Sequence, residues 1–160
     1  CAHYGDLGVE NAVVAAPDIS RAKVSETYAK RLGLPLAVVD RRRAVDGEVR
    51  VHGVIGDVAD RHVIFFDDEI ITGSSVAEGA QAVLERGATS VRAGCVHGTL
   101  VPGAADRLYA SGVEHLAVTD TIPLYSDNKG SQIAVCSVAS LFAQAIRAIH
   151  DETSISALFN

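Results

Sequence analysis

Short apolar runs alternate along this chain with segments whose apolar residues recur at helical spacing. The run at residues 63–66 is typical of a strand buried on both faces of a parallel sheet, because no polar residue interrupts it. Residues 49–55 alternate instead, which predicts a more exposed strand. The remaining apolar runs predict further strands at residues 11–16, 36–39, 91–96, 115–118 and 133–138.

Helical spacing predicts the elements between these strands. The clearest helix is expected at residues 138–149, and glycines are placed to end three others, at residues 24–32, 76–84 and 104–109. Strands that alternate with helices of this size predict right-handed βαβ units. We therefore expect an α/β fold, with a mostly parallel twisted sheet, helices on both faces and a single domain over residues 1–160.

Three polar or aperiodic segments are expected to lie outside these elements. Residues 40–43 read Asp-Arg-Arg-Arg and lead to Asp46-Gly47, which predicts a mobile loop or a hairpin turn. Residues 119–132 predict a second loop. Residues 1–10 show little periodicity and are interpreted as a lead-in or the remnant of a helix.

Composition and charge narrow the class of protein. The apolar fraction of 48% and the charged fraction of 21% are ordinary for a globular domain. The net charge of -6 argues against a nucleic-acid-binding surface, which needs an excess of basic residues. No apolar run approaches the length that crosses a bilayer, and no signal peptide is visible. The three widely spaced cysteines, Cys1, Cys95 and Cys136, predict reduced thiols in a cytoplasmic protein.

The strongest candidate for chemistry follows the apolar run at 63–66. Asp67 and Asp68 are expected at the carboxyl end of that strand, where open α/β sheets bind their ligands. Small hydroxyl residues and a glycine then open the next helix, and their N–H groups can enclose a phosphate; they are Thr72, Gly73, Ser74 and Ser75. Carboxylates beside a phosphate-binding turn suit a sugar phosphate with a divalent metal. The alternative is that Asp68 caps the turn and Asp67 is merely exposed.

This pattern resembles the phosphoribosyl-diphosphate (PRPP) binding loop of type I phosphoribosyltransferases and of ribose-phosphate diphosphokinases, the PRPP synthetases. Other short motifs resemble the carboxyl-terminal half of the synthetases, in the same order. They are Pro17-Asp18, Asp40-Arg41-Arg42-Arg43, Gly56-Asp57-Val58, His97-Gly98, Thr119-Asp120-Thr121-Ile122-Pro123 and the ending at residues 154–159. The resemblance covers nearly all of the chain and implies a phosphoribosyltransferase-like fold.

The resemblance implies transfer of the β,γ-diphosphate of ATP to ribose 5-phosphate, with Mg²⁺. Asp67 and Asp68 would then hold the ribose hydroxyls and associated metal, and residues 72–75 the 5-phosphate. Asp18 matches an aspartate at the divalent metal. Arg41 and Arg43 match two basic positions of a mobile catalytic loop, although a solvated basic turn is the alternative. His97 is interpreted as a hydrogen-bonded loop histidine.

Two departures from the family pattern bear on catalysis. Ile71 stands where the family loop has a third acid, and Glu69 is the nearest displaced carboxylate. Ile19-Ser20-Arg21 follows Pro17-Asp18 where the family has a glycine pair. Bulkier residues there hinder approach of the backbone to a diphosphate, and Arg21 could bind phosphate through its side chain instead.

Three functions therefore remain open. The first is a PRPP synthetase, of which this chain supplies the ribose 5-phosphate site. The second is a catalytically impaired regulatory or assembly subunit of the same family, and the third is a single-domain phosphoribosyltransferase. The chain has no methionine, even at position 1, so we expect it to be part of a longer product whose amino-terminal, ATP-binding domain is absent here. By analogy with the family, a homo-oligomer is expected.

Overall fold

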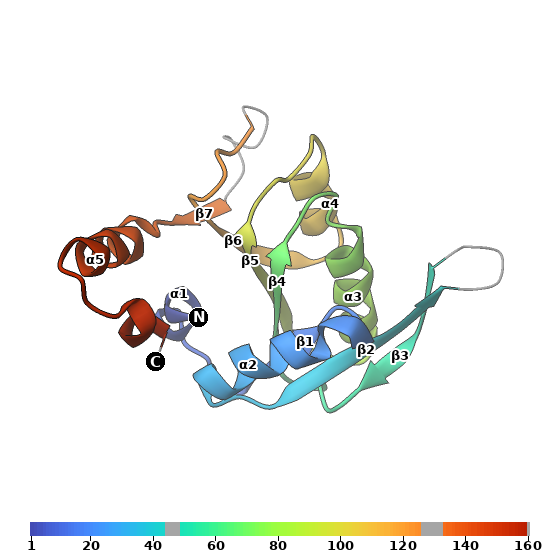
Figure 1. Cartoon of the computed structure of the whole chain (residues 1–160). Helices are drawn as coiled ribbons and strands as arrows, with labels where there is room; N and C mark the ends of the chain where they lie inside the picture. Colours follow the sequence, from blue (N-terminus) through green and yellow to red (C-terminus); the bar gives the residue numbers. More distant parts are fainter. Residues whose placement is uncertain (44–48, 126–132, 160) are drawn as a thin grey trace.

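The computed structural model describes residues 1–43, 49–125 and 133–159, and its centre is one sheet with the strand order β3-β2-β1-β4-β5-β6-β7 (Figure 1). The β2–β3 pair is antiparallel, and the other described pairs are parallel. The strands are β1 (Ala12–Ala16), β2 (Leu36–Arg43), β3 (Val49–Ile55), β4 (His62–Glu69), β5 (Ser90–His97), β6 (Val113–Thr119) and β7 (Ile133–Cys136).

Helices cover both faces of this sheet, so the predicted α/β class is confirmed (Figure 1). The helices α3 and α4 pack on one face, and α1 and α2 pack on the other. The helical elements are α1 (Ala2–Asp6), the 3-10 turn η1 (Ile19–Arg21), α2 (Ala22–Leu32), α3 (Ser74–Glu85), α4 (Ala104–Ala110), α5 (Ala139–His150) and the 3-10 turn η3 (Ile155–Phe159).

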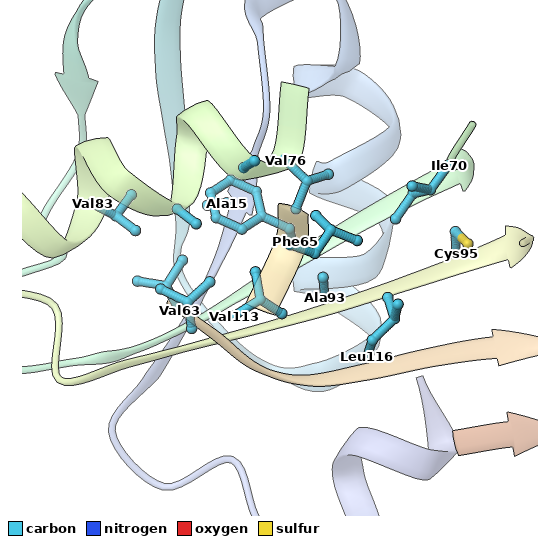
Figure 2. Close-up of a cluster of buried hydrophobic side chains, with 14 of the residues drawn as sticks. Ala15, Val63, Phe65, Ile70, Val76, Val83, Ala93, Cys95, Val113 and Leu116 are labelled. Carbon is cyan, nitrogen blue, oxygen red and sulfur yellow. The ribbon is translucent and has the colours of Figure 1, made fainter. Parts of the chain in front are cut away.

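Successive residues of β4 enter different cores, which explains its unbroken apolar run. Phe65 belongs to the cluster under α3, where Figure 2 shows it among Val63, Val76 and Val83. Phe66 belongs to the opposite cluster, beside Tyr28 of α2. A strand that is buried on both faces has no solvent-facing positions to fill with polar residues.

Two sequence predictions about local structure are corrected here. Residues 40–43 do not form a loop, because β2 continues through Arg43 and pairs with β3. Backbone hydrogen bonds to β3 hold this segment in a strand, although its side chains are polar. The last strand is also shorter than predicted, since β7 ends at Cys136 and α5 begins at Ala139. Asp46-Gly47 and residues 126–132 of the second predicted loop lie outside the described residues.

The helix α5 is the most clearly amphipathic element in the sequence, yet it buries none of its residues in this chain. Its large apolar side chains are between 44% and 69% exposed; they are Leu141, Phe142, Ile146 and Ile149. Figure 1 shows α5 set apart from the helices that cover the sheet. In the part of the chain that the structure describes, no helix has the length and apolarity needed to span a membrane.

The order of the strands creates a crevice between β1 and β4. From β1 the chain runs through α2 to β2, on one side, and from β4 it runs through α3 to β5, on the other. The two connections diverge from neighbouring parallel strands and lie on opposite faces. Ligands of open α/β sheets bind at such a switch point, beyond the carboxyl ends of the strands.

Candidate functional site

A cavity of about 220 Å³ lies in this crevice, between the segment after β1 and the start of α3. It gathers most of the site residues predicted from the sequence, although they come from distant parts of the chain. The predicted residues in its wall are Asp18, Asp67, Thr72, Gly73, Ser74 and Ser75. Its remaining wall is formed by Arg21, Glu69, Ile70, Ile71 and Val76.

The carboxylates at the end of β4 are joined by Arg21. The Nη1 of Arg21 donates to Oδ2 of Asp68 at 2.8 Å, and its Nε lies 3.4 Å from Oδ1 of Asp67. Burial raises the pKa of Asp67 to about 6, and a hydrogen bond with Asp68 acts in the same direction. The pKa of Asp68 is lowered to about 2, by its hydrogen bonds with Asp67 and with Arg21. One carboxyl of the pair is thus poised to gain or lose a proton near neutral pH.

Asp18 caps the 3-10 turn that follows β1. Its Oδ1 accepts a hydrogen bond from the backbone N–H of Arg21 at 3.1 Å and another from the hydroxyl of Ser20. This capping fixes the path of the chain into α2 and holds Arg21 at the mouth of the cavity. The aspartate expected at a metal therefore also has a structural role.

The turn at residues 72–75 has the geometry of an anion-binding helix start. Gly73 adopts a φ of 74° at the N-cap of α3, a conformation that disfavours residues with a Cβ. The hydroxyl oxygen of Thr72 lies 3.1 Å from the hydroxyl oxygen of Ser74, and it accepts a hydrogen bond from the backbone N–H of Ser74 at 3.4 Å. The first backbone hydrogen bond of α3 is donated by the N–H of Ala77. The N–H groups before it have no backbone partner within the helix, and they lie at its positive end, beside the cavity.

Arg41 lies in β2 and contacts this turn. Its Nη1 donates to the hydroxyl of Ser75 at 2.9 Å, and its Nε donates to Glu78 of α3 at 2.7 Å. The side chain is only 16% exposed, so its position is fixed by these partners. Arg43 ends β2 opposite Val49, and its side chain lies outside the described part. The structure thus brings Arg41 to the predicted phosphate turn, as part of a strand.

Of the residues that depart from the family pattern, Ile71 and Arg21 line the cavity, as does Glu69. Ile71 is 46% exposed and presents an apolar side chain where an acid was expected. Glu69 accepts a hydrogen bond from the hydroxyl of Thr99 at 2.6 Å, which directs it toward the loop after β5. His97, at the end of β5, pairs its Nδ1 with the hydroxyl of Thr121 at 2.9 Å. The predicted hydrogen bond is present, but His97 is the last residue of β5 and does not lie in the loop.

The expected Mg²⁺ stays a prediction, and the arrangement of the carboxylates does not fit an ion held by protein groups. Within residues 1–43, 49–125 and 133–159, no group of three or more His, Cys, Asp or Glu side chains could hold a metal. Mg²⁺ usually binds through one or two carboxylates together with water and substrate phosphates. Here the obvious pair, Asp67 and Asp68, is already neutralised in part by Arg21.

Sequence reasoning missed two features of the site. The contact of Arg21 with the carboxylates joins residues 47 positions apart, so no local pattern signals it. A second cavity of about 210 Å³ also reaches Asp67 and is bordered by the stacked rings of Tyr28 and Phe66, 4.7 Å apart. The three free cysteines, Cys1, Cys95 and Cys136, lie in its wall. Their spacing in the sequence gave no sign of this proximity.

The fold and the turn at the end of β4 define an α/β domain of the phosphoribosyltransferase type. Orotate phosphoribosyltransferase from Aeropyrum pernix matches 89% of this chain and 68% of its own, with a TM-score of 0.54 and 19% identity, which shows the fold alone. The model of the phosphoribosyl synthetase-associated domain matches residues 48–160, and the chain belongs to this family. The resemblance seen in the sequence motifs is therefore confirmed.

The relatives of this chain carry consistent names. A putative ribose-phosphate pyrophosphokinase of Streptomyces coelicolor is 37% identical over 99% of this chain and 50% of its own length. A ribose-phosphate pyrophosphokinase of Campylobacter jejuni is 39% identical over 94% and 48%, respectively. The crystal structure of phosphoribosylpyrophosphate synthetase from Mycobacterium smegmatis matches 94% of this chain and 49% of that one, with a TM-score of 0.84 and 34% identity. The chain thus spans about half the length of these relatives.

Proposed function

We propose that this chain supplies the ribose 5-phosphate site of a ribose-phosphate diphosphokinase, which transfers diphosphate from ATP to ribose 5-phosphate to make PRPP for nucleotide biosynthesis. The observation that carries the proposal is the cavity in which Asp67 of β4 faces the turn at residues 72–75. Acceptors for hydroxyl groups and donors for a phosphate meet there within one small space. The names of relatives that match nearly the whole chain support the same activity.

The residues of the cavity, together with Asp68 and Arg41 beside it, would each bind a different part of the sugar phosphate. The N–H groups and hydroxyls of residues 72–75 would bind the 5-phosphate at the positive end of α3. Asp67 and Asp68 would accept hydrogen bonds from the ribose hydroxyls. The anomeric oxygen would then attack the β-phosphorus of ATP, and the bond from that phosphorus to the α-phosphate oxygen would break to release AMP. Cations neutralise charge in such a transfer, and Arg41, with Arg43, would serve in that role.

The other assignments belong to the whole protein. We propose that residues 1–160 form a single domain and that ATP is bound chiefly by an amino-terminal domain corresponding to the unmatched half of the relatives. Mg²⁺ would enter as the counter-ion of the phosphates. We also propose a cytoplasmic location and a homo-oligomeric assembly, by analogy with the family, and no nucleic-acid or membrane partner; the net charge of -6 supports the proposal on nucleic acid.

A catalytically impaired subunit of the same family is the second candidate. It is favoured by Ile71, whose side chain can neither coordinate a metal nor accept a hydrogen bond from a hydroxyl group. It is also favoured by the contact of Arg21 with the carboxylates of Asp67 and Asp68. Formation of AMP from ATP and ribose 5-phosphate by the intact protein separates the two. Turnover at rates of ordinary enzymes supports a synthetase, whereas sugar-phosphate binding without turnover supports the impaired subunit.

Calorimetric titration with ribose 5-phosphate tests the binding site. We expect binding by the folded protein and much weaker binding of ribose, which lacks the phosphate. Ser75→Ala should weaken ribose 5-phosphate by about tenfold or more, because it removes a hydrogen bond to a charged group. Ser140→Ala, on exposed α5, is the matched control and should bind as the parent does. Absence of heat with ribose 5-phosphate from a folded sample would exclude the proposal.

A further inference from the structure

Arg21 contacts each of the carboxylates that were expected at a divalent metal. Its backbone N–H donates to Asp18 at 3.1 Å, its Nη1 donates to Asp68 at 2.8 Å, and its Nε lies 3.4 Å from Asp67. The contacts with Asp67 and Asp68 come from two nitrogens of one guanidinium, so a single positive charge serves both carboxylates. The guanidinium thus contacts one oxygen of Asp67 and one of Asp68, and the backbone N–H of the same residue contacts Asp18.

The position of Arg21 is fixed by the chain around it. Asp18 caps η1, accepts a hydrogen bond from the hydroxyl of Ser20 and so sets the backbone of Arg21, which is also the N-cap of α2. From there the side chain reaches to the end of β4 and is 36% exposed. Arg21 therefore has a fixed place in the cavity wall, because Asp18 holds its backbone and the carboxylates at the end of β4 hold its guanidinium.

We propose that Arg21 is a resident cation that takes the place of a divalent ion at Asp67 and Asp68, so that ribose 5-phosphate binds there without a metal at the pair. A divalent ion at these oxygens would lie within a few ångströms of the guanidinium and be repelled by it. Mg²⁺ also gives up its water reluctantly, so a partly neutralised pair is a poor site for it. The inference rests on the proposed function only for the identity of the sugar phosphate.

Titration with Mn²⁺ alone, followed by the electron paramagnetic resonance signal of the free ion, tests the resident cation. Arg21→Ala should bind Mn²⁺ at least about tenfold more tightly than the parent, since it uncovers two carboxylates and removes the repulsion. Arg31→Ala removes the same charge from an exposed position at the end of α2 and should bind Mn²⁺ as the parent does. Equal affinity in all three proteins, or weaker binding by Arg21→Ala, would overturn the proposal.

Two further variants and a ligand titration complete the test. Arg21→Lys keeps the charge and should retain the weak Mn²⁺ binding of the parent, whereas Arg21→Gln should resemble Arg21→Ala and serves if that variant does not fold. Ribose 5-phosphate should bind the parent equally well with and without EDTA. Binding that EDTA abolishes would contradict a metal-free pair. If ribose 5-phosphate gives no heat in either condition, the proposed function fails, and the Mn²⁺ titration still decides the role of Arg21.

Discussion

At the scale of single residues, Asp67 carries its charge in a place where burial opposes it. It is the last residue of β4 before the exposed end of the strand, and its side chain is largely covered. Arg21 offsets only part of the cost, because the pKa of Asp67 still rises from 3.8 to about 6. A carboxylate that costs stability yet stays in the wall of a cavity is what a binding site requires.

The pH dependence of stability follows from this pKa. Because the folded-state pKa lies above the ordinary value, the folded protein favours the protonated carboxyl and loses stability as pH rises from about 4 through about 6. The Asp67→Asn variant has no charge to titrate at this position. Its free energy of unfolding, relative to that of the parent, should therefore rise by about 1–3 kcal/mol between pH 4 and pH 8. Urea denaturation at both pH values measures this. The exposed Glu114→Gln is the control, and a difference for Asp67→Asn that does not change with pH would contradict the assignment.

Gly73 gives a second residue-scale prediction. A Cβ there would lie 3.0 Å from Cγ of Leu108, whereas Gly103, which begins α4 with a similar positive φ, has open space around it. Gly103→Ala should therefore cost only the left-handed backbone penalty of about 1–2 kcal/mol. Gly73→Ala should cost about 1–2 kcal/mol more, because packing against α4 is disturbed as well. Chemical denaturation of both variants checks this, and equal losses would show that the contact with Leu108 relaxes freely.

At the scale of elements, α3 and α5 have similar amphipathic patterns but different surroundings. The apolar side of α3 lies in the core against β4, as Figure 2 shows for Val76 and Val83 beside Phe65. The apolar side of α5 is exposed. A sequence pattern identifies which side of a helix is apolar, but it does not say whether the same chain supplies the covering surface.

Substitutions on these two helices should differ accordingly. Val83→Ala leaves a hole in a fully buried position of α3 and should lower the free energy of unfolding by about 2 kcal/mol. Ile146→Ser, at an exposed position of α5, should change it by less than about 0.5 kcal/mol. Urea denaturation at low protein concentration makes the comparison. A large loss for Ile146→Ser would mean that another surface covers α5 in solution.

The β4–α3 unit could be predicted from the sequence, whereas the full length of β2 could not. An apolar run, two acids, a glycine and a helical pattern are local signals, and together they located Asp67, Asp68 and residues 72–75 correctly at a strand end and a helix start. The polar end of β2 is a strand because β3 supplies its hydrogen bonds, which is information held elsewhere in the chain. At such positions the pairing with a neighbouring strand decides the structure, and the local sequence pattern does not.

At the scale of the whole molecule, the alternation of elements predicted the sheet but not the meeting of its loops. Strands and helices in turn indicate parallel βαβ units, and the structure has them. That Arg21 would lie on Asp67 and Asp68 depends on β1 and β4 being neighbours, although β2 and β3 separate them in the chain. The resemblance to a known family supplied the expected ligand and singled out Arg21, whereas the contacts of Arg21 with Asp67 and Asp68 are visible only in the structure.

The placement of the crevice between β1 and β4 has a consequence for how such a protein can change. The hollow exists because two connections diverge, so it persists whatever residues line it. The side chains that give it chemical character stand on the end of β4, on the turn η1 and on the first turn of α3. Ile19, Ser20 and Arg21, which stand where the family pattern has a glycine pair, lie on one of these segments and leave the strand order unchanged. The residues on these short segments can thus differ between related proteins while the crevice that they line is kept.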